Sequence, residues 1–259
     1  MLKLGGSVIT RKEKPLTADL KAIERLSREI SEAKVSPLIL IHGGGSFGHP
    51  LAKQYAIKEG YKQKSQLLGF SKTHQAMVTL NKLVVDALTR QSIAAVALQP
   101  SAFVVTKSDR ISCIEEQPLR KLLEIGFVPV LYGDAVFDFD LGFTILSGDQ
   151  LVAFLAMQLG ADRIILGIDE DGLHSCDPKS DSSAKLVHQI TLQQLNNMQH
   201  RIEEAKVTDV TRGMLGKILE LRPAIEKGIS ALIVNAAKPN NIYKALKGEK
   251  VTGTTIVKG

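Results

Sequence analysis

Short aliphatic runs alternate with longer amphipathic stretches along the whole chain. The aliphatic runs predict buried strands, and they cover residues 2–4, 38–41, 94–98, 128–132, 164–166, 231–234 and 254–257. Apolar residues at three-to-four spacing predict helices over residues 17–33, 66–90, 118–124, 149–159, 214–227 and 240–246. Strands that alternate with helices are typical of a mainly parallel sheet covered on both faces. The pattern therefore predicts an α/β protein.

Two further apolar segments are interrupted by turn residues and predict hairpins. One surrounds Asp109-Arg110, and the other joins residues 136–139 to residues 143–146 through a turn that ends at Gly142. The polar, proline-containing stretch from Asp177 to Ser183 predicts a loop. No internal repeat or long linker divides the 259 residues, so we expect one continuous structural unit.

The most informative segment is the octapeptide from His42 to His49, which reads His-Gly-Gly-Gly-Ser-Phe-Gly-His and comes directly after a predicted strand. Three consecutive glycines expose backbone N–H groups without a Cβ to hold a ligand away. Such a turn suits phosphate oxygens. A second glycine turn, Gly5-Gly6-Ser7, comes after the first predicted strand. The hypothesis is a site for two phosphorylated molecules.

Neither of the two common nucleotide motifs fits these glycines. Gly43, Gly45 and Gly48 match G-x-G-x-x-G, but that fingerprint needs a helix inside the motif and an acidic residue at the end of the next strand. Pro50 comes at once after the motif, and no strand is predicted before about Ala94. The segment around Gly213 and Lys217 lacks the spacing and the Ser/Thr of a P-loop.

Charge and composition narrow the class of ligand. The net charge is +6, but the 33 Lys and Arg residues are spread along the chain without a basic-aromatic platform, so we expect small anions and no nucleic acid. Lys3 lies inside an aliphatic strand, where either a phosphate-binding cation or an edge lysine that reaches solvent is compatible with the pattern. Taken alone, Lys12 and Lys217 are better explained as solvated surface lysines than as site residues.

Other features predict absences. The N-terminal residues carry no basic-then-apolar leader, and the apolar helix at 151–159 is much shorter than the ~20 residues that span a membrane. We therefore expect a cytoplasmic protein without a membrane segment. The two cysteines belong to no Cys/His cluster, and the histidines lack metal-ligand spacing, so no protein-bound metal is expected.

The motifs form an ordered set that resembles the amino acid kinase superfamily from end to end. They are Lys3-Leu4-Gly5-Gly6-Ser7, His42-Gly43-Gly44-Gly45, Ser147-Gly148-Asp149, Asp169-Glu170-Asp171-Gly172 with Asp177-Pro178, Thr208-Asp209-Val210-Thr211, and Gly213 with Gly216-Lys217. The resemblance implies an open αβα sandwich with a mainly parallel central sheet. It also implies an N-terminal lobe of residues 1–146 that holds the phosphoryl acceptor and a C-terminal lobe of residues 147–259 that holds ATP.

Within this superfamily, Ser46-Phe47-Gly48-His49 is similar to the isopentenyl phosphate kinases. The segments Gly5–Thr10 and Val130–Asp134 fit the same group. The resemblance implies that ATP phosphorylates isopentenyl phosphate to isopentenyl diphosphate, in an archaeal-type mevalonate route, and that the protein is a homodimer. A histidine suits this chemistry, because it donates a hydrogen bond to an acceptor that is itself an anion.

The resemblance also implies roles for individual residues. Catalytic roles fall to Lys3, Lys12, His49, Asp149 and Lys217, with Lys12 as transition-state stabiliser and Asp149 as the carboxylate that orients lysines. The residues implied to bind ATP are Lys3, Gly5, Gly6, Ser7, Gly44, Asp169, Gly213 and Lys217. Those implied to bind the acceptor are Gly43, Gly48, His49 and Gly148. Mg²⁺ is expected to arrive with ATP, and Phe70, Met77 and Val78 are candidates for the isoprenoid pocket.

The chain departs from the group at Arg212, where glycine is usual, and this leaves the geometry of the nucleotide loop open. Three alternatives to the isopentenyl phosphate interpretation also stay open. The protein could act on another phosphate or phosphonate, as fosfomycin-type kinases do, or on a carboxylate, as glutamate kinases do. It could also bind nucleotide without catalysis, although Lys3, Lys12, Asp149 and Lys217 together favour catalysis, since binding alone needs no transition-state cations.

Overall fold

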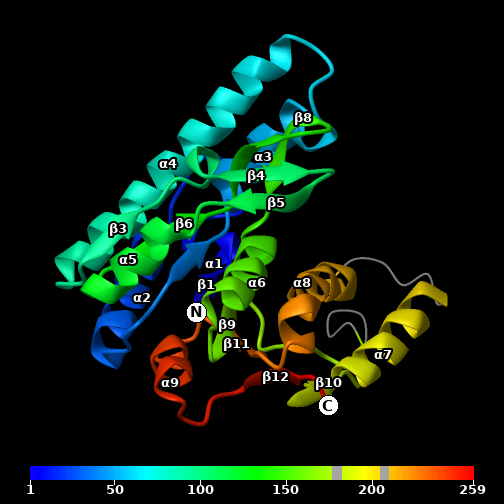
Figure 1. The fold of residues 1–259 in the computed structure, drawn as a ribbon. Helices are drawn as coiled ribbons and strands as arrows, with labels where there is room; N and C mark the ends of the chain where they lie inside the picture. Colours follow the sequence, from blue (N-terminus) through cyan, green and yellow to red (C-terminus); the bar gives the residue numbers. More distant parts are fainter. Residues whose placement is uncertain (177–182, 205–209) are drawn as a thin grey trace.

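The computed structural model describes residues 1–176, 183–204 and 210–259, with the side chains of all of these except 199–204 and 210–212. Its centre is an eight-stranded sheet (Figure 1) in the order β10-β12-β11-β9-β1-β2-β6-β3. These strands are β1 Leu2–Leu4, β2 Leu40–His42, β3 Ala95–Ala97, β6 Val128–Tyr132, β9 Arg163–Ile168, β10 Gln189–Thr191, β11 Ser230–Asn235 and β12 Gly253–Val257. Every neighbouring pair is parallel except β11 and β12.

A second sheet has four strands in the order β5-β4-β7-β8, with β4 Val104–Lys107, β5 Arg110–Ile114, β7 Asp134–Asp138 and β8 Gly142–Leu146. The two predicted hairpins are therefore present, and parallel pairing of β4 with β7 joins them. The Asp138 carboxylate holds both turns, because it accepts hydrogen bonds from the backbone N–H groups of Ser108, Asp109, Asp140 and Leu141.

Helices cover both faces of the central sheet. They are α1 Gly6–Ile9, α2 Leu20–Ala33, α3 Gly45–Gln54, α4 Ser65–Arg90, α5 Gln117–Ile125, α6 Gly148–Leu159, α7 Leu192–Glu204, α8 Val210–Glu226 and α9 Asn241–Lys247, with 3₁₀ turns η1 Ile57–Glu59 and η2 Pro100–Ala102. Buried side chains of α2, α4 and α9 form one core against the sheet. Those of α5, α6, α7 and α8 form the other. The αβα sandwich expected from the sequence is confirmed.

Alternation along the strands separates the two cores. Leu40 packs with α2 and α4, while its neighbours Ile39 and Ile41 pack with α6 and α8. Successive residues of a strand point to opposite faces, so an unbroken aliphatic run is what a strand covered on both sides requires. None of the described helices combines the length and the apolar composition needed to cross a membrane.

The boundaries differ from the predicted ones where side chains cap or redirect the backbone. The helix predicted from residue 17 begins at Leu20, because the Asp19 carboxylate accepts a hydrogen bond from the N–H of Ala22 at 3.0 Å. The segment 45–54, for which no helix was predicted, is helix α3. Elements β10 and α7 were not predicted. Residues 177–182 of the predicted loop lie outside the described residues.

One sheet spans both predicted lobes. Strands β3, β6, β2 and β1 come from residues 1–146, and strands β9, β11, β12 and β10 come from residues 147–259, so the division falls between β1 and β9. Glu29 also links the two parts, because its carboxylate accepts the N–H of Ile242 at 3.1 Å. The lobes share a backbone framework, and their functional separation stays a prediction.

Candidate active site

The two glycine turns lie against each other. Strands β1 and β2 are parallel neighbours with Leu4 opposite His42, so their carboxyl ends bring Gly5-Gly6 and Gly43–Gly45 to the same edge. A Cβ on Gly6 would lie 2.1 Å from the backbone N of Gly45, and a Cβ on Gly43 would lie 2.8 Å from the N of Gly6. The glycines are thus required by contact between the two turns, in addition to any room they leave for phosphate.

The second glycine turn leads directly into α3, which corrects the expectation that Pro50 prevents a helix. Pro50 lies inside α3. Proline lacks the N–H that would pair with the carbonyl of Ser46, four residues earlier. That carbonyl instead accepts a hydrogen bond from the N–H of Leu16 at 3.0 Å. The helix tolerates Pro50 because a distant segment satisfies the orphaned acceptor.

The exclusion of a dinucleotide fingerprint now rests on the strand that comes after α3. The next strand of the central sheet, β3, begins only at Ala95, so no strand end lies close enough to carry the acidic residue of the fingerprint. At the start of α3, the N–H of Ser46 donates to the Thr10 hydroxyl at 3.0 Å, and those of Phe47 and Gly48 donate to the Gly44 carbonyl. The positive end of the helix dipole still favours an anion there.

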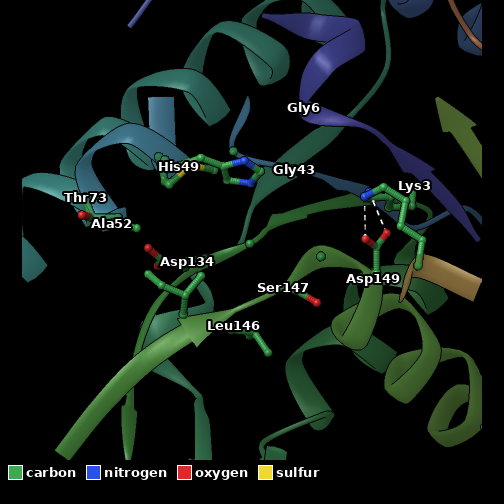
Figure 2. Close-up of a pocket in the computed structure, with 17 residues that line it drawn as sticks. Lys3, Gly6, Gly43, His49, Ala52, Thr73, Asp134, Leu146, Ser147 and Asp149 are labelled. Atoms are coloured by element: carbon green, nitrogen blue, oxygen red, sulfur yellow. Dashed lines mark hydrogen bonds and ion pairs between the residues drawn. The ribbon is translucent and has the colours of Figure 1, made fainter. Parts of the chain in front are cut away.

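Three charged side chains, Lys3, Asp149 and Lys217, form a network in a cavity beside the turns, and Figure 2 labels the first two. Lys3 is only 3% exposed, and its Nζ forms an ion pair with Oδ1 of Asp149 at 2.7 Å. Lys217 of α8 donates to Oδ2 of the same carboxylate at 3.0 Å. Asp149 lies in the first turn of α6, where the Ser147 hydroxyl caps the helix by accepting the N–H of Gln150. Lys3 is therefore no edge lysine.

Burial and charge set the protonation of this network. Burial lowers the pKa of Lys3, while the Asp149 carboxylate opposes that effect. Burial works to raise the pKa of Asp149, but Lys3 and then Lys217 outweigh it, and the pKa lies below its usual range. Asp149 therefore stays ionised and holds two cations in place. A carboxylate in this state orients lysines and is a poor general base.

His49 lies on α3 and lines two adjoining cavities. In Figure 2 its ring projects into the space between the glycine turns and Asp134. Burial first, and then the positive charges of Lys217 and Lys3, lower its pKa. The ring is therefore neutral at pH 7 in the absence of ligand. A bound anion would offset the lysine charges and favour the protonated ring.

The cavity that contains the charged network, named here the acceptor cavity, has a volume of about 120 Å³. Its lining is Lys3, Gly6, Gly43, Gly44, Gly48, His49, Ala52, Thr73, Met77, Gly133, Asp134, Ile145, Leu146, Ser147, Gly148, Asp149 and Lys217. One part is cationic and glycine-rich. Another is apolar, with Ala52, Met77, Ile145 and Leu146. This combination suits an anionic group joined to a small apolar chain.

The adjoining cavity, named here the nucleotide cavity, has a volume of about 510 Å³. It is lined by Gly5, Gly6, Ser7, Lys12, Gly45, Ser46, His49, Pro50, Ile168, Asp169, Glu170, Gly213, Met214 and Lys217. Asp169 accepts hydrogen bonds from the Ser7 hydroxyl at 2.8 Å and from Lys12 Nζ at 2.7 Å. A Cβ on Gly213 would meet no atom within 4 Å, so this glycine leaves open space at the rim.

The predicted site residues all line one of these cavities. Gly6, His49 and Lys217 line both. Three placements differ in detail from the implied roles. Lys3 and Gly44 border the acceptor cavity alone, although both were assigned to ATP, and Lys12 reaches Asp169 on the nucleotide side, away from the acceptor cavity. The roles of the individual residues stay predictions.

Sequence reasoning assigned no role to several residues of the acceptor cavity, chiefly Thr73, Asp134 and Ser147. Met77 was proposed for the apolar pocket and does line it; its Sδ would lie 3.1 Å and 2.9 Å from a Cβ on Gly44 and on Gly48. Val78 is 39% exposed and, like Phe70, lies outside the lining. Position 73 is one helical turn before Met77, so the helical period of the segment could have found Thr73.

His42, the first histidine of the octapeptide, is structural. It is fully buried at the end of β2, where its ring stacks on Tyr132 and its Nε2 lies 3.1 Å from Oδ1 of Asn81. Burial lowers its pKa to about 4. Within the part of the chain that the structure describes, no three His, Cys, Asp or Glu side chains are grouped as metal ligands. Asp177-Pro178, Thr208-Asp209 and the side chain of Arg212 lie outside the described residues.

Comparison with known proteins agrees with this geometry. The model of the amino acid kinase family matches residues 1–235. An isopentenyl phosphate kinase of Methanothermobacter thermautotrophicus is 44% identical, with 99% of this chain and 98% of the relative covered. One of Methanocaldococcus jannaschii is 36% identical, with 99% and 97% covered. A crystallographic structure of an isopentenyl phosphate kinase has a TM-score of 0.86 at 42% identity, with 98% of each chain covered. The chain therefore belongs to the amino acid kinase family, and within it to the isopentenyl phosphate kinases.

Proposed function

We propose that the protein transfers the γ-phosphoryl group of ATP to isopentenyl phosphate and releases isopentenyl diphosphate and ADP. The observation that carries the proposal is the junction of the two cavities, where Gly6, His49 and Lys217 border both. Two phosphorylated molecules that enter from either side would bring their phosphates together at these residues. The archaeal relatives of the same name fit an archaeal-type mevalonate route.

The reaction is a direct in-line displacement. A phosphate oxygen of isopentenyl phosphate attacks the γ-phosphorus, the bond to the β,γ-bridging oxygen breaks, and ADP leaves with the electron pair. The attacking oxygen is already ionised at neutral pH, so the step needs no general base. It does need positive charge around the spreading oxygen charge. Lys3 and Lys217 supply it, and their shared carboxylate, Asp149, fixes their positions.

His49 binds the acceptor phosphate in this proposal. It stands at the cationic end of the acceptor cavity, with Gly43, Gly48 and Gly148 around it. An imidazole N–H donates to a non-attacking phosphate oxygen, and a protonated ring does so more strongly. Burial and then the two lysines lower the pKa of His49 in the free protein, and the arriving anion offsets the effect of the lysines. Acceptor binding is therefore coupled to the protonation of this ring.

Lys12 and Asp169 act on the nucleotide side. Lys12 is 65% exposed and pairs with Asp169, so its side chain is free to exchange one anionic partner for another. We propose that Lys12 moves to the transferring phosphoryl group when ATP is present. Gly5, Gly6, Ser7 and Gly213 would contact the nucleotide phosphates. Mg²⁺ would enter as part of the substrate Mg·ATP.

Two broader predictions belong to the same proposal. The acceptor is predicted to bind residues 1–146 and ATP residues 147–259. The cavity linings divide less sharply, because eight of the fourteen residues around the nucleotide cavity belong to residues 1–146. The protein is a homodimer, as the resemblance implies. Light scattering coupled to size-exclusion chromatography tests the second prediction, and a monomer mass at working concentration would contradict it.

A substrate panel tests the function directly. Purified protein with Mg·ATP is assayed with isopentenyl phosphate, dimethylallyl phosphate, fosfomycin, glutamate and carbamate, and ADP release is monitored. We expect turnover with the prenyl phosphates, because the acceptor cavity joins cationic and apolar parts. Turnover with fosfomycin or glutamate alone would establish another kinase. ATP binding without turnover of any acceptor would establish a non-catalytic nucleotide-binding protein.

A further inference from the structure

The acceptor cavity contains a second carboxylate that the proposed mechanism does not use. Asp134 is the first residue of β7, and its side chain is 0% exposed to solvent. Figure 2 shows Asp134 well separated from the Lys3–Asp149 pair, on the side of the cavity toward Thr73 and Ala52. A buried carboxylate is costly unless it is paired and hydrogen-bonded. Its partner is therefore informative.

That partner is His74 of α4. Its Nδ1 lies 3.0 Å from both carboxylate oxygens of Asp134. An ionised carboxylate only accepts hydrogen bonds, so Nδ1 carries the proton and donates. Oδ1 also accepts the N–H of Ala135 at 2.8 Å. Among the described residues, His74 is the only basic side chain that pairs with Asp134. The His74 side chain is 19% exposed, so it exchanges protons with solvent more readily than the carboxylate.

The charge of this pair matters because of the ligand that the cavity must hold. A phosphate monoester brings negative charge, and an isoprenoid chain brings apolar surface. A carboxylate in the cavity wall without a compensating positive charge would repel the phosphate group. It would also lose its hydration where the isoprenoid chain covers it. Protonated His74 removes the net charge of that wall. The opposite wall keeps Lys3 and Lys217 against the single charge of Asp149.

We propose that His74 is a positioning residue for the acceptor: its protonated ring neutralises and orients Asp134, and loss of that proton weakens acceptor binding but not ATP binding. The inference rests on the proposed function, since it assumes an anionic, apolar acceptor in this cavity. His74 itself is not among the residues that line the cavity, so it acts through Asp134.

The direction of the pH effect depends on the neighbours of the pair. Hydrogen bonding to Asp134 raises the pKa of His74 above 6.5, against the opposing effect of burial. The Tyr132 phenol of β6 has its pKa raised by burial and then by Asp134, so it stays neutral. The Ser101 hydroxyl of η2 lies 3.5 Å from Nδ1 and does not titrate. His49 of α3 has a lowered pKa and is already neutral above 6.5 in the free protein.

Of these groups, only His74 changes charge in the free protein as the pH rises from 6.5 through its raised pKa. The coupling of acceptor binding to His49 adds a pH dependence that is common to every protein that keeps His49. The contribution of His74 to acceptor affinity is complete below that range and is lost above it. ATP affinity should not show the same curve, because neither His74 nor Asp134 lines the nucleotide cavity.

The test measures KM for isopentenyl phosphate and for ATP between about pH 6 and about pH 9, a range that brackets a raised histidine pKa. The proteins are wild type, His74→Gln, Asp134→Asn, the double variant, and His188→Gln as control. His188 is exposed and lies outside both cavities. Glutamine keeps an N–H donor for Asp134 but cannot carry a positive charge. A higher acceptor KM in this variant is therefore due to the missing charge.

We expect the wild-type acceptor KM to rise about ten-fold across this range, as loss of one compensating charge in a partly desolvated site produces. The profiles are read relative to Asp134→Asn, because His49 and the acceptor phosphate titrate alike in all of these proteins. On that scale His74→Gln should be raised at every pH, and wild type should rise from the Asp134→Asn value to the His74→Gln value. The double variant should behave like Asp134→Asn, because the histidine charge has no role without the carboxylate. The control and every ATP KM should match wild type.

Several results would overturn the inference. A His74→Gln profile like that of wild type would do so, as would equal rises in the KM values for acceptor and ATP, which indicate a structural defect. If His74→Gln does not fold, the Asp134→Asn profile decides: a rise in acceptor KM as steep as that of wild type refutes the pairing. Absence of wild-type turnover with prenyl phosphates would refute the proposed function and this inference together, whereas turnover with unchanged profiles refutes the inference alone.

Discussion

Replacing Asp149 by asparagine tests the charged network most directly, because the substitution keeps the shape of the side chain and removes its charge. Lys3 would lose its counter-ion at 2.7 Å while it stays 3% exposed. At an effective dielectric constant of about 20, that pair has a gross attraction of about 6 kcal/mol. Breaking a buried pair by removing one partner costs a net 3–5 kcal/mol or so. Lys217 is 39% exposed, and its screened pair adds about 1 kcal/mol at most.

We therefore expect Asp149→Asn to lower the free energy of unfolding by about 3–5 kcal/mol. The matched control is Asp86→Asn, whose carboxylate pairs with Lys82 at 2.5 Å on the exposed face of α4. That substitution should change the free energy of unfolding by about 0.5 kcal/mol or less, as exposed i,i+4 pairs do. Urea unfolding monitored by circular dichroism measures both values.

The same variant should lose about 10²–10³-fold in kcat, the usual effect of removing preorganised charge at a developing anion. Without Asp149, the effect that opposes burial is lost, so the pKa of Lys3 falls further and a smaller fraction of Lys3 is protonated at a given pH. Residual activity of the variant should therefore increase as the pH is lowered, relative to wild type. The reasoning would be refuted if Asp149→Asn changed the free energy of unfolding as little as Asp86→Asn does and also kept kcat within about three-fold of wild type.

Three other features of the structure carry predictions. His49→Ala should lower turnover of isopentenyl phosphate by about 10²-fold while the ATP Kd, measured by calorimetry, changes little; an equal loss of ATP affinity would place His49 on the other substrate. Gly6→Ala should destabilise the fold and abolish ATP binding, because its Cβ would lie 2.1 Å from the N of Gly45. Gly216→Ala, where a Cβ meets nothing within 4 Å, should stabilise α8 by about 0.5–1 kcal/mol; similar melting shifts for the two variants would contradict this contrast. Burial works to raise the pKa of Asp138, but its hydrogen bonds, led by those from Leu141 and Asp109, lower the pKa to about 2. This carboxylate should contribute about 2 kcal/mol of stability above pH ~4, which is lost as the pH falls through about 2; an acid-unfolding curve of Asp138→Asn that matches wild type would be inconsistent with that contribution.

The secondary structure was largely predictable because most elements bury one face or both. The aliphatic runs 128–132 and 231–234 became β6 and β11 within a residue at each end. The helical period of residues 66–90 became α4, which begins at Ser65. Boundaries shifted where a single polar contact ends or starts an element, as Asp19 does for α2. Such contacts leave no periodic signal.

Much of the candidate site was also within reach of the sequence. Parallel strands present their carboxyl ends at one edge, so glycine turns after two neighbouring strands meet there. That rule brings Gly5-Gly6 and Gly43–Gly45 together. The resemblance extended the set to Asp149, Asp169 and Lys217, which the structure places along the same two cavities. The error at Pro50 arose because local rules for proline assume that its missing hydrogen bond has no substitute.

The sequence by itself determined the αβα architecture, the glycine turns at the strand ends and the charge types around them, because these depend on residue identity and short-range spacing. Only the tertiary structure decided which charges pair. Lys3 with Asp149, Lys12 with Asp169 and His74 with Asp134 each join residues at least 60 positions apart. Their burial decides whether a carboxylate orients lysines, whether His49 is neutral and whether Pro50 fits a helix. Those properties depend on solvation and on neighbours that only the folded chain brings together.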